Sequence, residues 1–207
     1  MKCLRWIIPF LLLLVSACTP EEDTTANRNA TEPTQPNRSL RTPPAIPTVY
    51  DFDLTDVDWR TTHVRIENDR VTFDHIGQSK MLIHLFSTRA DLCRIQLPYL
   101  NDLQRHHPEW FVLGIVVPEA IDAKTLRRYM LREGITFFIS HTPDNVPFAR
   151  WLAHKAQLGE NYPLPLTFLF ENGNYVTHYE GITPVEMIEY DLRTLHTNST
   201  AKGTGQP

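Results

Sequence analysis

Short apolar runs of strand length recur through the middle of the chain, each bounded by polar or turn-forming residues. The runs are Lys80–Phe86, Trp110–Val117, Ile135–Ile139 and Leu166–Phe170. The second run is continuous and rich in β-branched residues, which is typical of a strand covered on both faces. These four segments therefore predict the buried centre of a β-sheet.

Between and after these runs, apolar residues recur at helical spacing. The predicted helices are Asp91–His106, Asp122–Arg132, Val146–Leu158 and a last helix that ends near Leu195. The last helix follows Thr183-Pro184-Val185-Glu186, in which Thr183 is placed to cap the helix and Glu186 to complete a capping box.

Two segment pairs have the pattern of β-hairpins. They join Thr62–Ile66 to Arg70–Phe73 and Leu166–Phe170 to Tyr175–Tyr179. The second pair is connected by Asn172-Gly173, a dipeptide that favours a two-residue hairpin turn. The acidic segment Asp53–Trp59 lacks the Gly and the distal Glu of a calcium loop, so we expect a solvated turn with Trp59 packed inward.

The order of these elements predicts the fold class. Strands and helices alternate in the middle of the chain, and a hairpin stands near each end. This order is typical of an α/β fold with a mixed central β-sheet flanked by helices. We expect the folded domain to span residues 49–196.

The first 18 residues resemble a bacterial lipoprotein signal peptide. Two basic residues precede the apolar stretch Trp6–Val15, which is too short to span a bilayer comfortably, and small residues then lead to Cys18. The resemblance implies that Cys18 is acylated and anchors the protein to a lipid bilayer. Thr19, in place of an aspartate, implies the outer membrane of a bacterial cell envelope, on its periplasmic side. An uncleaved anchor or an ordinary signal peptide is the alternative.

The segments that flank the domain are polar. Residues 19–48 are rich in Pro, Thr and Asn, with almost no large apolar residue before Leu40, so we expect a disordered tether. Residues 197–207 have no apolar face, and we expect a disordered tail.

Composition narrows the possible chemistry. The 207 residues are enough for one domain with flanking segments. A net charge of −4, with no basic stripe, argues against nucleic acid as a partner. Of the three cysteines, Cys3 and Cys18 fall in the leader, so Cys93 is the one thiol of the predicted domain.

The stretch from Lys80 to Pro98, together with a segment far downstream, resembles the thioredoxin-like proteins. In that family an apolar strand leads into Cys-X-X-Cys at a helix start, a proline follows five residues later, and a cis-proline opens a later strand. Cys93 matches the second cysteine, Pro98 the helix proline and Pro165 the cis-proline, but Ala90 stands in place of the nucleophilic cysteine. The resemblance implies a thioredoxin-like fold. The extra helix and strand within residues 122–139 resemble the redoxin branch, which includes peroxiredoxins and membrane-tethered thiol oxidoreductases.

Ala90 cannot attack a disulfide, so classical dithiol exchange through this motif is excluded. A standard peroxidase is disfavoured because no second domain cysteine is present to resolve a sulfenic acid, although a one-cysteine enzyme that uses external thiols stays open. Cys93 alone is a candidate monothiol that forms mixed disulfides, with Arg89, Arg94 and the helix N-terminus favouring its thiolate. The alternative is a buried structural cysteine.

The histidines offer further candidates. His84 falls where thioredoxins hold a buried acid that moves the proton of the second cysteine, so it is a candidate proton relay; a hydrogen-bonded core histidine is the alternative. His106-His107 is expected to cap its helix rather than to bind metal. A copper site that combines Cys93 with His84 or His141 is disfavoured because it has one cysteine only. The sequence indicates no metal and no cofactor.

Leu164 and Pro165 are the candidate substrate-binding residues, because in the family the residue before the cis-proline pairs with an extended polypeptide. That the proline only shapes the fold is the alternative. Three hypotheses follow. The chain is a monothiol acting through Cys93 on a thiol-containing partner, a non-catalytic module holding an unfolded or extended envelope client at Leu164-Pro165, or a structural lipoprotein that only presents a surface.

Overall fold

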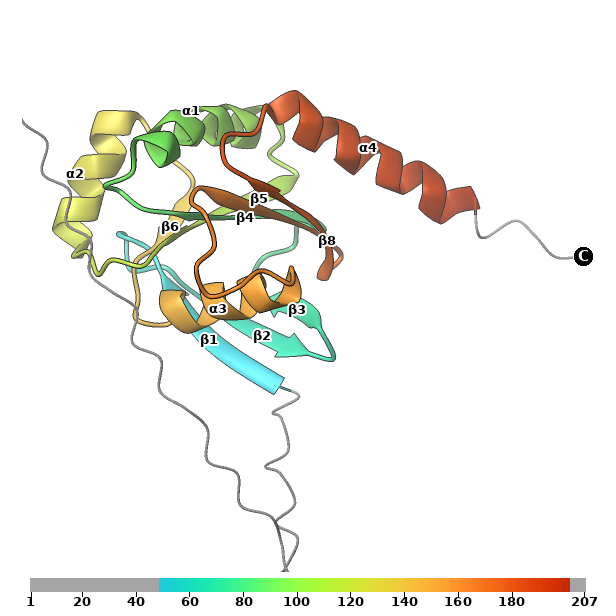
Figure 1. Ribbon diagram of the computed structural model, residues 1–207, viewed down its shortest axis with the longest axis horizontal. Coiled ribbons are helices and arrows are strands. Elements are labelled where there is room, and N and C mark those ends of the chain that lie inside the picture. Colours follow the sequence, from blue (N-terminus) through green and yellow to red (C-terminus); the bar gives the residue numbers. More distant parts are fainter. Residues whose placement is uncertain (1–48, 202–207) are drawn as a thin grey trace, which may run out of the picture. The chain divides into compact units, whose positions relative to one another are not determined.

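The structure is a computed structural model and describes residues 49–201, with side chains described to residue 194. This part of the chain forms eight strands and four helices, whose arrangement is drawn in Figure 1. The strands are β1 (Val49–Thr55), β2 (Thr61–Glu67), β3 (Arg70–Phe73), β4 (Lys80–Phe86), β5 (Trp110–Val116), β6 (Phe138–Ser140), β7 (Leu166–Glu171) and β8 (Asn174–Glu180). The helices are α1 (Asp91–His106), α2 (Ala123–Glu133), α3 (Asn145–Lys155) and α4 (Val185–Ala201).

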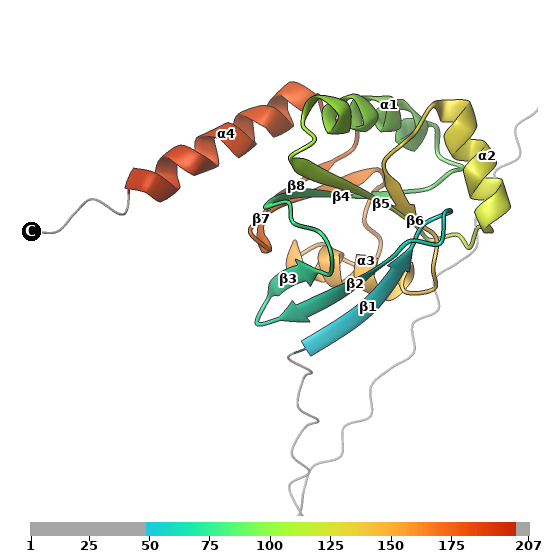
Figure 2. The ribbon, with the colours of Figure 1, turned by 180° about the vertical axis from the view of Figure 1, so that it is seen from behind.

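The central sheet has five strands in the order β6-β5-β4-β7-β8. Strands β4, β5 and β6 run parallel, and β7 and β8 are antiparallel to their neighbours, so the mixed α/β fold predicted from the sequence is confirmed. The remaining strands, β1 to β3, form a separate antiparallel sheet. Helices α1, α2 and α4 lie on one side of the central sheet, and α3 and the smaller sheet lie on the other (Figures 1 and 2).

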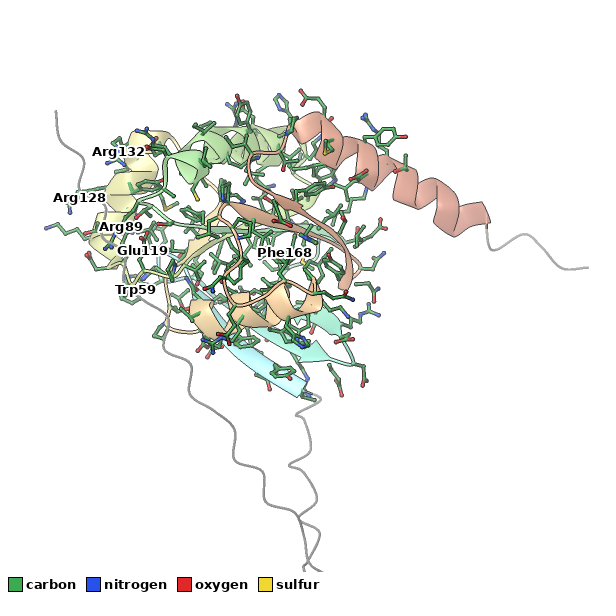
Figure 3. All side chains as sticks on the ribbon, viewed as in Figure 1. Trp59, Arg89, Glu119, Arg128, Arg132 and Phe168 are labelled. Carbon is green, nitrogen blue, oxygen red and sulfur yellow. The ribbon has the colours of Figure 1, made fainter. Side chains whose placement is uncertain are left out.

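Two apolar clusters hold these layers together, one on each face of the central sheet. On β4, Ile83 and Leu85 enter the cluster that contains α3, whereas Leu82 and Phe86 enter the cluster that contains α1. This alternation between faces explains why the β4 sequence is apolar at almost every position. Phe168 of β7, labelled in Figure 3, belongs to the α3 cluster and is fully buried.

The candidate site lies at one end of the central sheet. The carboxyl ends of parallel β4, β5 and β6 meet there, and because β7 is antiparallel its first residue, Leu166, pairs with Leu85 near the end of β4. The last residue of β8, Glu180, pairs in turn with Leu166. Segments that are far apart in the sequence are therefore neighbours at this end.

The segment around Trp59 differs from expectation. Residues 49–55 form β1, which the sequence analysis did not identify as a strand, and Trp59 is 78 % exposed instead of packed inward. Asp56 is buried, and its carboxylate accepts hydrogen bonds from the backbone N–H groups of Asp58 and Arg60 and from the Arg60 side chain. This tight turn places Trp59 at a φ of 62°, facing solvent.

The capping box predicted for the last helix is wrong. Gln96 of α1 accepts a hydrogen bond from the N–H of Thr183 and donates one to its carbonyl oxygen, so a tertiary partner takes the amide that Glu186 was expected to bind. Helix α4 continues to Ala201 instead of ending near Leu195, so residues 197–201 of the predicted tail are helical. Strand β6 is shorter than predicted, and α3 begins and ends earlier.

The predicted signal peptide, the acylated Cys18 and the tether lie outside the described residues, as do residues 202–207. Among the helices of residues 49–201, none has the length and apolar character needed to cross a bilayer.

Two glycines give a stability test of the turn that joins β7 to β8. Gly173 and Gly134 both have positive φ, at 77° and 65°, but a Cβ on Gly173 would meet the carbonyl oxygen of Val71 whereas one on Gly134 meets nothing. We expect Gly134→Ala to lower the free energy of unfolding by about 1 kcal/mol through its backbone conformation alone. Gly173→Ala should lower it by about 3 kcal/mol because β3 must also move. Urea unfolding measures both, and equal losses would contradict the account.

Candidate functional site

Cys93 lies in the first turn of α1, where the sequence analysis placed it, and its side chain is fully buried. It belongs to the same apolar cluster as Phe86 and Leu97. The backbone N–H of Ser87, the first residue after β4, donates a hydrogen bond to its Sγ at 3.4 Å. The thiol is therefore enclosed by its own helix, the end of β4 and the loop that joins them.

Burial raises the pKa of the Cys93 thiol. The N–H of Ser87 opposes this shift, and the charge of Glu119 adds to it, so the neutral thiol is favoured. The two arginines that were expected to favour the thiolate have carboxylate partners, since Arg89 pairs with Glu119 at 3.3 Å and Arg94 with Asp91 at 3.1 Å.

Glu119 is a central residue of this site that the sequence analysis missed. One of its oxygens accepts hydrogen bonds from the N–H and the hydroxyl of Thr88, both at 2.6 Å, and the other accepts one from the hydroxyl of Ser87 at 2.9 Å. Figure 3 shows Glu119 beside Arg89. Its carboxylate thus fixes the loop in which thioredoxins carry the nucleophile. The available signal was its position shortly after the buried β5 run, at the carboxyl end of a parallel strand.

His84 is fully buried on β4. Its Nδ1 is 2.9 Å from the hydroxyl oxygen of Thr167, its ring stacks on Phe86, and its Nε2 has no partner among the described residues. Burial lowers the pKa of His84 to about 3, so the ring is neutral at ordinary pH. No hydrogen bond joins His84 to Cys93 within residues 49–194, so a relay between them stays a prediction.

The Leu164–Pro165 peptide bond is cis, as the resemblance implies, and so is Val117–Pro118, which was not expected. The carbonyl oxygen of Pro165 accepts a hydrogen bond from Gly181 at 2.8 Å. Leu164 is half-buried and packs against both apolar clusters, one of which contains Cys93 and is also contacted by Ala90. The structure thus brings Ala90, Cys93 and Leu164 to one end of the sheet.

His107 and His141, the other histidines considered above, lie in different parts of the fold. The two ring nitrogens of His107 lie 3.0 Å from Glu109 and 3.1 Å from Glu189, and its ring stacks on Trp110, so it connects the end of α1 to α4. His141 follows β6, and its Nε2 is buried without a partner among the described residues. Within the same residues, no three His, Cys, Asp or Glu side chains are grouped so as to hold a metal ion.

No protein-family model matches the chain, and no curated protein matches it. Solved structures do match. A thiol:disulfide interchange protein of the thioredoxin family from Chlorobium tepidum TLS aligns with a TM-score of 0.53 at 17 % identity, over 70 % of this chain and 92 % of the other. StoA from Bacillus subtilis aligns with a TM-score of 0.50 at 16 % identity, over 72 % and 99 %.

The chain has a thioredoxin-like fold. The predicted extra helix and strand are present as α2 and β6. At these identities the likeness establishes the arrangement of the backbone and not an activity.

The buried neutral imidazole predicts a pH-dependent stability. The pKa of His84 in the folded chain lies below the ordinary histidine value of 6.5, so below that pH the unfolded chain binds a proton that the folded chain excludes. The free energy of unfolding should therefore fall by about 1.4 kcal/mol per pH unit from His84 alone as pH drops below 6.5, and keep falling toward the folded-state pKa. Urea unfolding between pH 7 and 5 should show a steeper loss in the wild type than in His84→Gln.

His63 provides the control with the opposite sign. Its hydrogen bonds to Asp53 and Asp51 raise its pKa, so His63→Gln should remove stability that is gained as pH falls. Parallel pH profiles for the wild type and His84→Gln would show that His84 does not stay neutral in the folded protein.

Proposed function

We propose that this protein is a membrane-tethered envelope module that binds an extended polypeptide at Leu164-Pro165 without thiol chemistry. The observation that carries the proposal is the complete burial of the Cys93 thiol beside Ala90, which has no nucleophile. A buried thiol with a raised pKa is a poor nucleophile, because the thiolate is the reactive species. The solved structures that match include thiol:disulfide interchange proteins, but this chain lacks the residue that starts such exchange.

The backbone at Leu164 supports binding by strand addition. Within the described residues, no backbone hydrogen bond involves the N–H or the carbonyl of Leu164, which directly precedes β7. Ile182, 41 % exposed, follows Gly181, whose N–H binds the Pro165 carbonyl. A polypeptide strand laid along Leu164 would meet free peptide groups and an apolar neighbour.

The predicted leader supports an envelope location. An acylated Cys18 would hold the protein at the bilayer, and the segment 19–48 would keep the domain within reach of clients there. We propose the periplasmic side of the outer membrane, as Thr19 implies.

Monothiol exchange at Cys93 is the second candidate. It is favoured by the N–H of Ser87, which donates to Sγ and stabilises a thiolate. For a partner to reach Cys93, the hydrogen bonds from Ser87 and Thr88 to Glu119 would have to break, because the loop that contains these two residues borders the thiol.

Alkylation separates the two candidates. We expect iodoacetamide at neutral pH to modify Cys93 in the folded full-length chain at least about a hundredfold more slowly than in urea, since the reagent must wait for local opening. Mass spectrometry of the peptide that contains Cys93 gives the rate. Glu119→Gln should speed modification by loosening the loop, whereas Asp122→Asn, a change outside that loop, should not. Fast modification of the wild type would favour monothiol exchange.

Client binding tests the proposal directly. We expect full-length protein in detergent to bind reduced, carboxymethylated α-lactalbumin, an unfolded probe, and Cys93→Ser to bind it equally well. Ala90→Trp and Leu164→Arg should weaken binding at least about tenfold, because they fill or charge the surface that receives the strand. Leu131→Trp, at an exposed position on α2, is the matched control. Equal binding by all four variants, or none by the wild type, would refute a client site at Leu164.

A further inference from the structure

The two most exposed large apolar side chains of the described residues are Trp59 and Leu131, at 78 % and 76 %. Arg127 of α2 joins the segments that carry them. Its guanidinium donates to the carbonyl oxygen of Val57 and pairs with Asp58, the residue before Trp59, at 2.8 Å. Leu131 lies one helical turn after Arg127. We call the surface formed by Trp59 and the exposed side of α2 the α2 face.

The turn that carries Trp59 is held in place from two sides. The carboxylate of Asp56 binds the backbone N–H groups that follow it, and Arg127 binds the carbonyl of Val57. Trp59 thereby keeps a φ of 62°, which is rare for a bulky residue. Backbone conformations of this kind gather at binding and active sites. The outward position of the Trp59 ring therefore indicates a contact with a partner.

The exposed side of α2 is basic. It carries the four cations Lys124, Arg127, Arg128 and Arg132, which share one half of the helix surface with Leu131. Figure 3 shows Trp59, Arg128 and Arg132 along the same side of the molecule.

Three carboxylates lie close to these cations. Asp58 pairs with Arg127, Glu133 pairs with Arg132, and Asp122 caps α2 through Thr125. Lys124 and Arg128 make no ion pair within residues 49–194. The α2 face thus has one more cation than it has carboxylates, around two protruding apolar side chains.

This combination matches the headgroup region of a lipid bilayer. Tryptophan favours that region because its ring lies in apolar surroundings while its N–H stays in contact with polar groups. Lysine and arginine are attracted to anionic lipid headgroups. The predicted tether, residues 19–48, would hold the domain beside the bilayer at an effective concentration of roughly millimolar. A face with a small net charge is sufficient for docking under that condition.

We propose that the α2 face docks on the anionic lipid bilayer to which the chain is tethered, with Trp59 and Leu131 in the headgroup region. Lys124 and Arg128 then lie against lipid phosphates. The inference rests on the membrane tether of the proposed function and not on its client site at Leu164. Docking holds the domain in one orientation on the bilayer, whereas a tether alone leaves it free to rotate.

Quenching of Trp59 by lipid tests this docking. The full-length chain is reconstituted from detergent into vesicles of phosphatidylethanolamine and phosphatidylglycerol with brominated acyl chains, which quench tryptophan fluorescence on contact. The chain has four tryptophans, so Trp59→Phe gives the signal of the other three, and the difference reports Trp59 alone. We expect the Trp59 signal of the wild type to be quenched at least about twofold. Flotation of the vesicles shows separately whether the chain is bound to them.

Charge reversals on the α2 face should release the domain without releasing the chain. Arg128→Glu and Lys124→Glu should each lower the ratio of docked to free domain about fivefold or more, and phosphatidylcholine in place of phosphatidylglycerol should have a similar effect. Leu131→Ser should lower the ratio about threefold. Arg150→Glu makes the same charge change at an exposed arginine of α3, on the other side of the central sheet, and should leave the ratio unchanged.

The outcomes separate this inference from the proposed function. A chain that floats with the vesicles while Trp59 stays unquenched would overturn the docking and leave the tether standing. Equal losses in Arg128→Glu and Arg150→Glu would also overturn it, because the effect would then reflect net charge. A chain that does not float would overturn the tether and the docking together. The client test is made in detergent without a bilayer, so its result is independent of docking.

Discussion

The carboxylate of Glu119 fixes the loop between β4 and α1, and this loop borders the thiol of Cys93. Ser87 belongs to both parts of the arrangement, because its hydroxyl donates to Glu119 while its N–H donates to the sulfur. Thioredoxin chemistry needs that loop to expose a thiolate, whereas here the position that would carry it is Ala90. The hydrogen bonds of Ser87 to Glu119 and to the Cys93 sulfur therefore keep the thiol enclosed.

With the thiol enclosed, the end of the sheet keeps features suited to binding. Within the described residues the peptide groups of Leu164 make no backbone hydrogen bond, and Ile182 is an exposed apolar side chain. Their proximity comes from the topology, since parallel β4, β5 and β6 end where antiparallel β7 begins. We propose that this end of the sheet binds a polypeptide although Ala90 stands where thioredoxins carry the nucleophile.

Features with a local signal could be predicted from the sequence. The bounds of β4 and α1 follow from apolar periodicity and agree with the structure, and the position of Cys93 in the first turn of α1 follows from them. Features that depend on distant partners could not. Glu119 acts through a loop some thirty residues earlier, and Gln96 displaces the expected capping partner of Thr183 across 87 residues. Trp59 was expected inside because of its apolar ring, but Asp56 takes the buried position by satisfying the turn.

Thiol trapping in intact cells that make the protein tests the central claim most directly. Free thiols are blocked at harvest, disulfide-linked species are separated without reductant, and Cys93→Ser identifies any species formed through that residue. The account predicts that Cys93 is never linked to another protein or to a small thiol. A reproducible mixed disulfide that disappears in Cys93→Ser would contradict it.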